Sequence, residues 1–336
     1  MKGNFNMRKR MPRLRAKVTR KLRRLLDDIL RIPLQRRVEK RKRSRAQLRY
    51  QEQPKTTFII QSFNKRKNLR AIVEALREGG ADEIIGIDDG SIDNSHEEWM
   101  RLLDQPNDFL LRCNDLYEVR TYDRAIRMAK GEYVCLLQDD DIPPKDGQWI
   151  RNALRLLDGL PTLLILGGRS GLELFAPDPV DAHHKPEYKR TGDIAGCPGV
   201  NKYRMHDHPI FSAYDMPFMF VMAINRAPMF IRRHAFLELG GIDPTFAPFQ
   251  CDDIDTCLKA WLHGYQVGLY AAPFLRDVGK GGMRSFNAQG VSAQAAKNWG
   301  EIYRRYGRHL EGRSLQLMVD SANTALVSLH AEPPRS

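Results

Sequence analysis

The sequence predicts an α/β fold built around a mostly parallel sheet, preceded by a basic helical extension. From Thr56 onward, apolar runs of four to six residues alternate with amphipathic segments, as in strands joined by helical crossovers. Residues 1–55 hold 21 Lys and Arg against 4 Asp and Glu, a net of +17, and the other residues hold 33 against 37, a net of −4. The overall charge of +13 therefore comes from a separate N-terminal arm on a mildly acidic body.

The N-terminal extension, residues 1–50, is expected to be a basic amphipathic helix followed by a linker. Its apolar residues recur at three- and four-residue spacing until Pro33: Leu14, Val18, Leu22, Leu25 and Ile29. Lys and Arg fill the other faces, which favours contact of residues 8–49 with an anionic membrane surface. Nucleic acid is the less favoured partner, and a solvated arm or a helix packed on the body is the structural alternative.

Composition points to a globular chain of 336 residues, 42% hydrophobic. No apolar run is long enough for a membrane-spanning helix, and the N-terminus lacks the features of a secretory signal. The five cysteines form no CxxC pair, so reduced thiols are expected rather than disulfides or zinc. The expected location is cytoplasmic, peripheral on the cytoplasmic face of a membrane if the arm binds lipid.

The body is expected at residues 51–290, with halves at about 56–145 and 146–290, and a helical segment and tail at 291–336. Predicted strands lie at 57–60, 83–87, 109–111, 133–137 and 227–233. Predicted helices lie at 69–76, 119–129, 234–239 and 256–262. Right-handed crossovers should make the early strands parallel.

Three polar loops follow predicted strands: Gln61-Ser62-Phe63-Asn64, Asp88-Asp89-Gly90-Ser91 and Gln138-Asp139-Asp140-Asp141. In open parallel sheets, ligands bind beyond the carboxyl ends of the strands, where these loops lie. Read alone, the Asp run favours a solvated turn. An acidic rim repels phosphate, so a nucleotide would need a bridging divalent metal or contacts through its base and ribose. A second acidic group, Asp252-Asp253-Ile254-Asp255, exceeds what capping a helix requires.

Two further features have open interpretations. His206-Asp207-His208 could bind a metal, but a metal site is not favoured because no other Cys or His stands at suitable spacing. Acceptor binding is the favoured role of the segment between Gly167 and Met222. Trp149 and Trp261 could stack on sugars, although core positions are favoured.

The residues from about Thr56 to Phe286 resemble the family 2 glycosyltransferases, inverting enzymes of the GT-A fold that use nucleotide-diphosphate sugars. Four segments carry the resemblance: 58–64, the Asp-Asp-Gly-Ser-x-Asp loop at 88–93, Ala-Lys-Gly-Glu-Tyr-Val at 129–134 leading into 138–141, and Gly-Gly-Ile-Asp at 240–243 with 252–255. The resemblance implies a GT-A, Rossmann-like domain and polysaccharide biosynthesis as the usual role.

The resemblance also implies residue roles. A divalent cation, Mn²⁺ or Mg²⁺, would be held by Asp140 and Asp277, because Gln138 replaces the first Asp of Asp-x-Asp and Asp277 stands about where some members have a His. Asp253 would be the general base, with Asp252 as the fallback. The nucleotide-sugar donor would contact Gln61, Asn64, Asp88, Asp89, Asp139, Arg120 and Arg124.

These assignments predict metal-assisted sugar transfer, from a UDP-sugar by default, to a glycan or lipid-linked acceptor. Two alternatives stand beside it. An inactive glycosyltransferase-like scaffold, recruited by the basic arm, is conceivable because of Gln138 and the missing His. A sugar-phosphate nucleotidyltransferase would require a glycine-rich loop after the first strand, which is absent.

Overall fold

The computed structural model describes residues 54–176, 188–190, 198–203, 212–213, 215–277 and 288–331. The predicted N-terminal helix and linker lie outside these residues, as does His206-Asp207-His208. The chain from Pro54 onward is one compact unit. The domain boundaries at 50 and 290 therefore stay predictions, and α8 (Ala288–Glu311) crosses the second of them.

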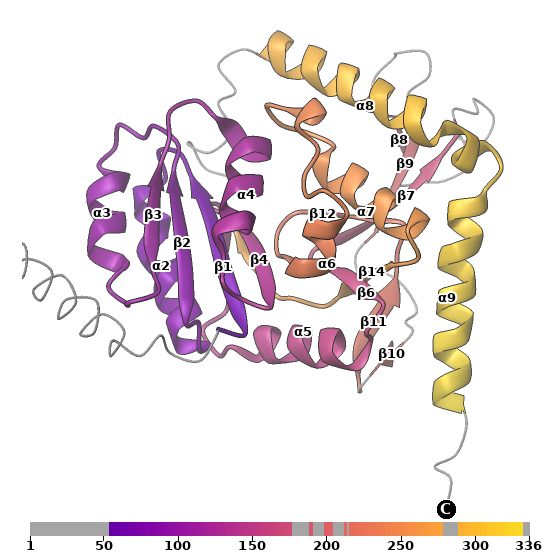
Figure 1. Ribbon diagram of the computed structural model, residues 1–336, viewed down its shortest axis with the longest axis horizontal. Helices are drawn as coiled ribbons and strands as arrows, with labels where there is room; N and C mark the ends of the chain where they lie inside the picture. Colours follow the sequence, from indigo (N-terminus) through magenta and orange to yellow (C-terminus); the bar gives the residue numbers. More distant parts are fainter. Residues whose placement is uncertain are drawn as a thin grey trace, which may run out of the picture. The chain divides into compact units, whose positions relative to one another are not determined.

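The described residues form a nine-stranded sheet in the order β10-β11-β14-β6-β13-β4-β1-β2-β3 (Figure 1). Its strands are β1 (Thr56–Ser62), β2 (Glu83–Asp88), β3 (Phe109–Arg112), β4 (Tyr133–Gln138), β6 (Leu163–Gly167), β10 (Ser212–Ala213), β11 (Met216–Phe220), β13 (Met229–Arg232) and β14 (Gln266–Tyr270). Strands β1 to β4 are parallel, and β13 runs antiparallel to β4 and β6. The prediction of a mostly parallel sheet is confirmed. The antiparallel direction of β13 was not predicted from the sequence.

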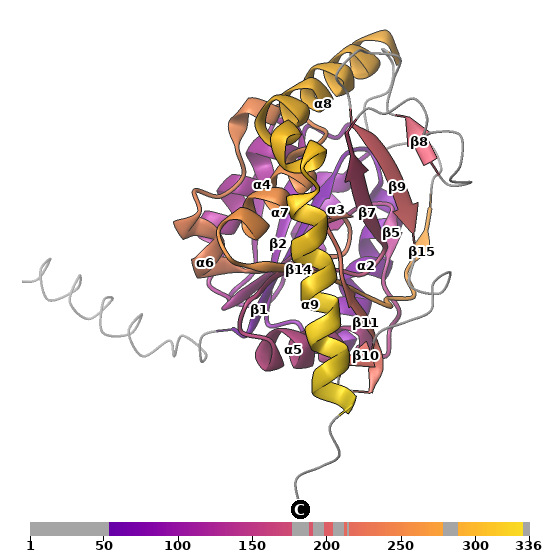
Figure 2. The same ribbon diagram turned by 90° about the vertical axis from the view of Figure 1, so that its right-hand side faces the viewer.

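Helices cover both faces of this sheet. The described α-helices are α2 (Arg66–Glu78), α3 (Ser95–Leu102), α4 (Tyr117–Met128), α5 (Gln148–Gly159), α6 (Arg233–Glu238), α7 (Asp252–Leu262), α8, which contacts β7 (Ser170–Phe175) of a smaller sheet, and α9 (Ser314–Ala331). Because β1→β2→β3 advance in one direction and β4 returns past β1, right-handed crossovers put α2 and α3 on one face and α4 on the other. Helix α9 packs against β10 and β11 (Figure 2).

The return from β3 to β4 creates a switch point between β1 and β4, where open sheets bind ligands. The register aligns the strand ends there, since Gln61 pairs with Gln138 and Ser62 with Asp88. The three polar loops of the sequence therefore begin at one edge of the sheet.

A smaller antiparallel sheet, in the order β12-β7-β9-β8, lies next in the chain. Its strands are β7 (Ser170–Phe175), β8 (Tyr188–Arg190), β9 (Gly199–Tyr203) and β12 (Ala223–Asn225). A two-stranded pair joins β5 (Asp141–Ile142) to β15 (Leu275–Arg276), so the chain after β14 reaches the acidic loop that follows β4.

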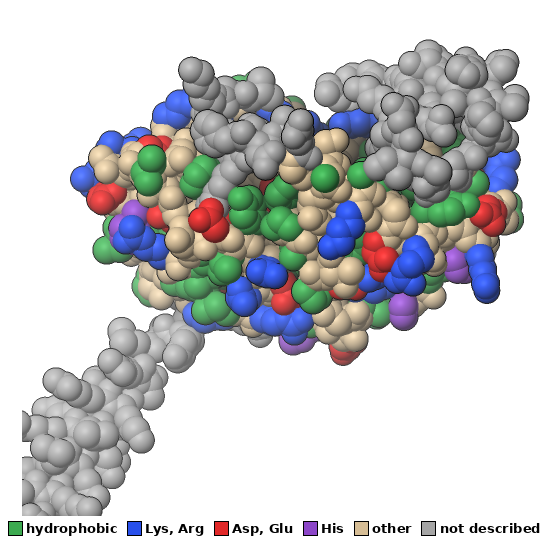
Figure 3. Space-filling model, turned by 90° about the horizontal axis from the view of Figure 1, so that it is seen from above, with side chains coloured by type: hydrophobic (Ala, Val, Ile, Leu, Met, Phe, Trp, Pro, Cys, Tyr) green, Lys and Arg blue, Asp and Glu red, His purple; other side chains and the backbone are tan. Residues whose placement is uncertain are grey.

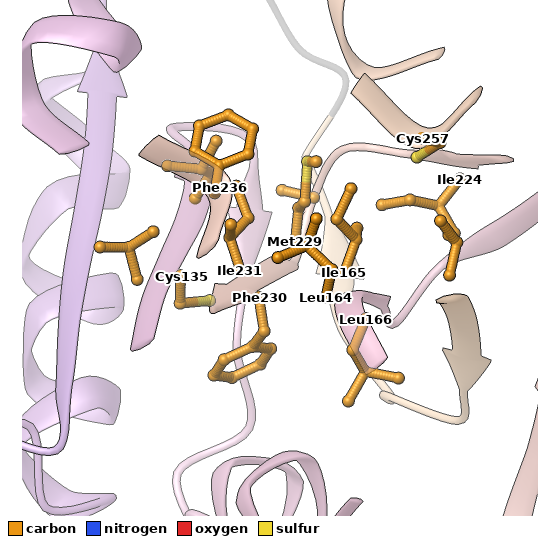
Figure 4. Packing of buried hydrophobic residues seen from close by; sticks show 14 of the residues in the cluster. Cys135, Leu164, Ile165, Leu166, Ile224, Met229, Phe230, Ile231, Phe236 and Cys257 are labelled. Carbon is orange, nitrogen blue, oxygen red and sulfur yellow. The ribbon is translucent and has the colours of Figure 1, made fainter. Parts of the chain in front are cut away.

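The core is continuous across the large sheet. Figure 4 shows Cys135 of β4 beside Phe230 and Ile231 of β13, with residues 164–166 of β6 alongside. Phe230 makes tilted or edge contacts with Phe58 and Trp149. Trp149 and Trp261 are both buried in this core, as their sequence positions favoured.

Gly131 explains one motif of the sequence physically. A Cβ at this position would lie 2.6 Å from the backbone nitrogen of Thr57, closer than real Cβ contacts allow. The Gly131 N–H also donates to the Thr57 hydroxyl, 2.9 Å away. The glycine before β4 thus lets the loop pass directly over the start of β1.

The described surface mixes its charges. Seen from above, Lys and Arg side chains are interspersed with Asp and Glu (Figure 3). Among the described helices, none is long and apolar enough to cross a membrane.

Replacing Phe230 by Ala should lower the free energy of unfolding by about 3–5 kcal/mol, because it leaves a cavity beside the Phe58 and Trp149 rings. The matched control is Ile92→Ala, since Ile92 is 90% exposed and its loss should change stability by less than about 0.5 kcal/mol. Urea unfolding followed by circular dichroism measures both. Similar losses in the two variants would contradict this description of the core.

Candidate functional site

Two adjoining cavities lie at the switch point. The first, about 100 Å³, is lined by residues of the β1 and β4 loops with the start of α4: Gln61, Ser62, Phe63, Asp89, Tyr117, Glu118, Gln138, Asp139, Asp140, Phe249 and Arg276. The second, about 350 Å³, is lined by Glu118, Gln138, Arg169, Leu172, Val200, Lys202, Asn225, Arg226, Gln250, Cys251, Asp252, Asp253, Ile254, Arg276 and Trp299. Glu118, Gln138 and Arg276 line both. The two predicted acidic groups therefore face neighbouring spaces with a shared wall.

Asp139 holds the loops after β1 and β4 together. Its carboxylate accepts a hydrogen bond from the Phe63 N–H at 2.8 Å, and its carbonyl accepts one from the Asn68 side chain at 2.8 Å. Burial raises the pKa of Asp139 to about 7, although the Phe63 N–H opposes that shift. Asp139 borders the first cavity, yet its bonds are those of a residue that shapes a loop.

The β2 loop is held in the same way. Asp89 accepts hydrogen bonds from the Leu116 and Tyr117 N–H groups at 3.0 and 2.8 Å, which fixes the start of α4 beside the first cavity. Asp88 is fully buried and accepts from the Ser91 N–H at 3.1 Å. Asn64, in the left-handed region, accepts from the Ile92 N–H at 2.8 Å and so joins the first loop to the second. Five residues of these loops were predicted to contact the nucleotide-sugar donor. Of these, Gln61, Asp89 and Asp139 line the first cavity, and Asn64 and Asp88 hold the loops that form it.

Asp140 presents its carboxylate to the first cavity. Its side chain is 20% exposed and lies 3.1 Å from the Arg276 guanidinium. The Asp277 N–H donates to the Asp140 carbonyl at 2.8 Å, so the two predicted metal ligands are neighbours. The Asp277 carboxylate, however, lies 2.8 Å from the Lys67 amine and accepts from the Asn68 side chain at 3.0 Å.

This arrangement offers a divalent cation few protein ligands. Among the residues that the structure describes, no group of three His, Cys, Asp or Glu could hold a metal ion. Mg²⁺ sites are commonly built from one or two carboxylates completed by water and substrate phosphates. The donor set around Asp140 fits that kind of site, in which the diphosphate itself supplies ligands, and does not fit a closed protein cage.

A buried arginine organises the second cavity. The Arg226 guanidinium forms an ion pair with Asp252, lies 3.6 Å from Glu118 and packs 4.6 Å from the centre of the Tyr122 ring. Burial alone would lower the pKa of Arg226, but the Asp252 and Glu118 carboxylates raise it overall. The guanidinium therefore stays charged and joins the end of β12 to α4 and α7.

The two predicted catalytic carboxylates have different surroundings. Asp252 is 2% exposed and is engaged by Arg226. Asp253 is partly exposed, and it accepts hydrogen bonds only from the Arg226 and Ile254 N–H groups among the described residues, at 3.2 and 2.9 Å. Burial, followed by the charge of Asp252, raises the pKa of Asp253. Of the two, Asp253 is the one suited to accept a proton from a ligand.

Sequence reasoning did not find several residues that line the site. Glu118 accepts a hydrogen bond from the Gln138 side chain at 3.1 Å, and burial raises its pKa to about 7 against the opposing effect of Arg226. Neither Glu118 nor Arg226 belongs to a sequence motif that predicts a site. An arginine within the apolar run 221–231 is nevertheless a signal for a buried ion pair. The predicted phosphate-facing residues Arg120 and Arg124 are exposed on α4 and line neither cavity.

The sequence of this chain is similar to a known protein family and to two curated proteins. Residues 57–177 match the model described as glycosyl transferase family 2. An uncharacterized protein, y4gI, of Sinorhizobium fredii is 25% identical over 228 residues, which cover 63% of this chain and 23% of the relative. An uncharacterized glycosyltransferase, MG060, of Mycoplasma genitalium is 33% identical over 97 residues, which cover 26% of this chain and 33% of the relative. The match therefore spans about a quarter to a third of these relatives.

Among solved structures, GalNAc-T7 in complex with UDP, GalNAc and Mn²⁺ is similar in fold, with a TM-score of 0.54 and 12% identity. The match covers 76% of this chain and 50% of GalNAc-T7. At this identity the likeness concerns the fold, and it agrees with the predicted GT-A class.

Asp252→Asn and Asp253→Asn should affect stability differently. Removing the Asp252 charge leaves the buried Arg226 without its nearest partner, which should cost about 3–5 kcal/mol of unfolding free energy. Asp253→Asn keeps an acceptor for one of the two backbone N–H groups and loses the acceptor of the other, so the loss should be about 1 kcal/mol. Chemical denaturation compares them with Asp82→Asn, an exposed control. Equal losses for the two variants would refute the assignment of Asp252 as the partner of Arg226.

Proposed function

We propose that this chain, which contains a glycosyl transferase family 2 domain at residues 57–177, transfers a sugar from a nucleotide-diphosphate donor to an acceptor hydroxyl with inversion. The observation that carries the proposal is the pair of adjoining cavities with Asp140 in one and Asp253 in the other. Inverting transfer requires the leaving group and the base on opposite sides of the sugar. The shared wall formed by Glu118, Gln138 and Arg276 is where that sugar would lie.

The donor belongs to the first cavity in this proposal. The β1 and β2 loops would contact the nucleoside, and Gln61, Asn64, Asp88, Asp89 and Asp139 remain its proposed contacts, directly or through the loops they hold. A UDP-sugar is the proposed donor, supported by the family match and by the UDP bound in the similarly folded GalNAc-T7. For the diphosphate, Arg276 is the better-placed cation, because it borders both cavities, whereas Arg120 and Arg124 border neither.

Asp140 would hold a divalent cation, Mn²⁺ or Mg²⁺, together with the donor diphosphate. When bound, the cation would neutralise charge on the departing nucleoside diphosphate. Asp277 remains a proposed neighbour of that site, although its carboxylate is engaged by Lys67 and Asn68. Arg276, which pairs with Asp140, could turn toward the diphosphate and add to this stabilisation.

On the acceptor side, Asp253 would remove the proton of the attacking hydroxyl. The new bond forms between the acceptor oxygen and the anomeric carbon, while the bond from that carbon to the diphosphate oxygen breaks and its electrons leave with the nucleoside diphosphate. Asp252 would keep Arg226 in place rather than touch the substrate. The acceptor is proposed to be a glycan or a lipid-linked glycan. Contact of residues 8–49 with an anionic membrane remains a proposal from sequence.

Asp253→Asn should reduce kcat by at least about a hundredfold while leaving donor binding intact, because a general base supplies ~10²–10⁴-fold. In the unchanged protein, kcat/KM should fall as the pH is lowered, starting above the ordinary Asp pKa of about 3.9, because protonated Asp253 cannot accept a proton. Three groups lie near the Asp253 carboxylate and shift its pKa: the Asp252 carboxylate, Arg226 and the Ile254 N–H.

The assay is nucleotide release from a panel of UDP- and GDP-sugars with Mn²⁺, across pH, with donor affinity from calorimetry. Asp82→Asn serves as the control for a lost surface charge. Full activity of Asp253→Asn would rule out this base. No nucleotide release by the unchanged protein from any donor, with acceptors supplied, would favour the inactive scaffold instead.

Removing the divalent cation should abolish turnover and weaken donor binding. Treatment with EDTA should reduce nucleotide release at least about tenfold, with recovery on adding Mn²⁺, and Asp140→Asn should mimic the loss without a comparable loss of stability. The exposed Asp104→Asn is the control. Equal donor affinity with and without Mn²⁺ in the unchanged protein would argue against a metal at Asp140.

A further inference from the structure

One wall of the second cavity belongs to the small antiparallel sheet. Val200 and Lys202 are two residues apart on β9, so their side chains project to the same face, and Leu172 of β7 pairs directly with Lys202. All three line the cavity. This wall is therefore an apolar surface that carries a single ammonium group.

Arg169 stands at the end of that wall. It immediately precedes β7, where Ser170 pairs with Asn225 of β12, so the antiparallel register brings Arg169 beside Arg226. Both arginines line the second cavity. Two neighbouring guanidinium groups repel one another unless anions or solvent screen them.

The arginines that line the second cavity differ in whether they form an ion pair with a carboxylate. Arg226 is matched by Asp252 and Glu118, and Arg276 is matched by Asp140. Arg169 forms no ion pair with any carboxylate in the described part of the chain. Arg169 therefore adds an unmatched positive charge to the lining of the second cavity, and the Lys202 ammonium belongs to the same lining.

Trp299 of α8 also lines the second cavity and is only partly buried. Its ring offers a flat apolar surface, and ligand sites typically combine such surfaces with a few placed polar groups. The volume, about 350 Å³, lies at the lower end of the range of small-molecule sites.

We infer that the second cavity binds an acceptor that carries a phosphate or carboxylate group close to the sugar whose hydroxyl reacts. The anionic group lies against Arg169 and Lys202, the sugar packs on Trp299, and the hydroxyl faces Asp253. Guanidinium groups recognise both anions through paired hydrogen bonds, which is the chemistry the two share. This inference deepens the proposed function and rests on it for the identity of the reacting hydroxyl.

The test measures binding of three matched probes to the full chain with UDP present: glucose, glucuronate and glucose 6-phosphate. At least one anionic probe should bind about tenfold or more tightly than glucose, the gain expected from a charge-assisted hydrogen bond. The two anions distinguish a carboxylate acceptor from a phosphate acceptor. The preference should disappear in the double variant Arg169→Gln, Lys202→Gln and persist in Arg155→Gln, an exposed control on α5.

UDP affinity, measured in parallel, should be unchanged in the double variant, because neither residue lines the first cavity. Equal affinity for the three probes, no binding of either anion, or an anion preference that survives the double variant would overturn the inference. Anion-selective binding in a protein that releases no UDP from any donor would instead count against the proposed function and leave this site standing.

Discussion

The site depends on one buried guanidinium. Arg226 lies where the end of β12, the first turn of α4 and the start of α7 meet, and its ion pair with Asp252 and proximity to Glu118 join these three segments. A buried arginine is costly unless it is paired, and a group of buried carboxylates is equally costly without it. Each therefore requires the other. Asp253, the next residue, is partly exposed and accepts a hydrogen bond from the Arg226 N–H.

The loops on the opposite side of the shared wall are shaped by a different device. The carboxylates of Asp139 and Asp89 accept hydrogen bonds from backbone N–H groups, and the Asp277 carboxylate interacts with Lys67 and Asn68. The Asp140 carboxylate, which also lines the first cavity, is paired instead with the Arg276 guanidinium. The acidic run therefore contains Asp139, which holds two loops together, and Asp140, which lines the first cavity beside Arg276.

The sequence was informative where the chain is locally periodic. The strands at 57–60 and 133–137 and the loops after them could be predicted, because alternation, glycine and the strand-end position are local signals. The antiparallel β13 and the second sheet could not, since strand order depends on contacts between residues far apart in the chain. Arg169, Arg226 and Glu118 were missed for the same reason: each gains its meaning from partners that no short motif contains. Arg120 and Arg124, chosen from a motif position alone, lie on the solvent side of α4.

The pairing of Gln61 with Gln138 and of Ser62 with Asp88 has a consequence for how this protein can diverge. Adding or deleting one residue within β4 would shift this strand against β1, so that Gln138 would no longer lie opposite Gln61 and the loop after β4 would move relative to the loops after β1 and β2. The segment from Tyr133 to Asp140 is therefore expected to keep its length.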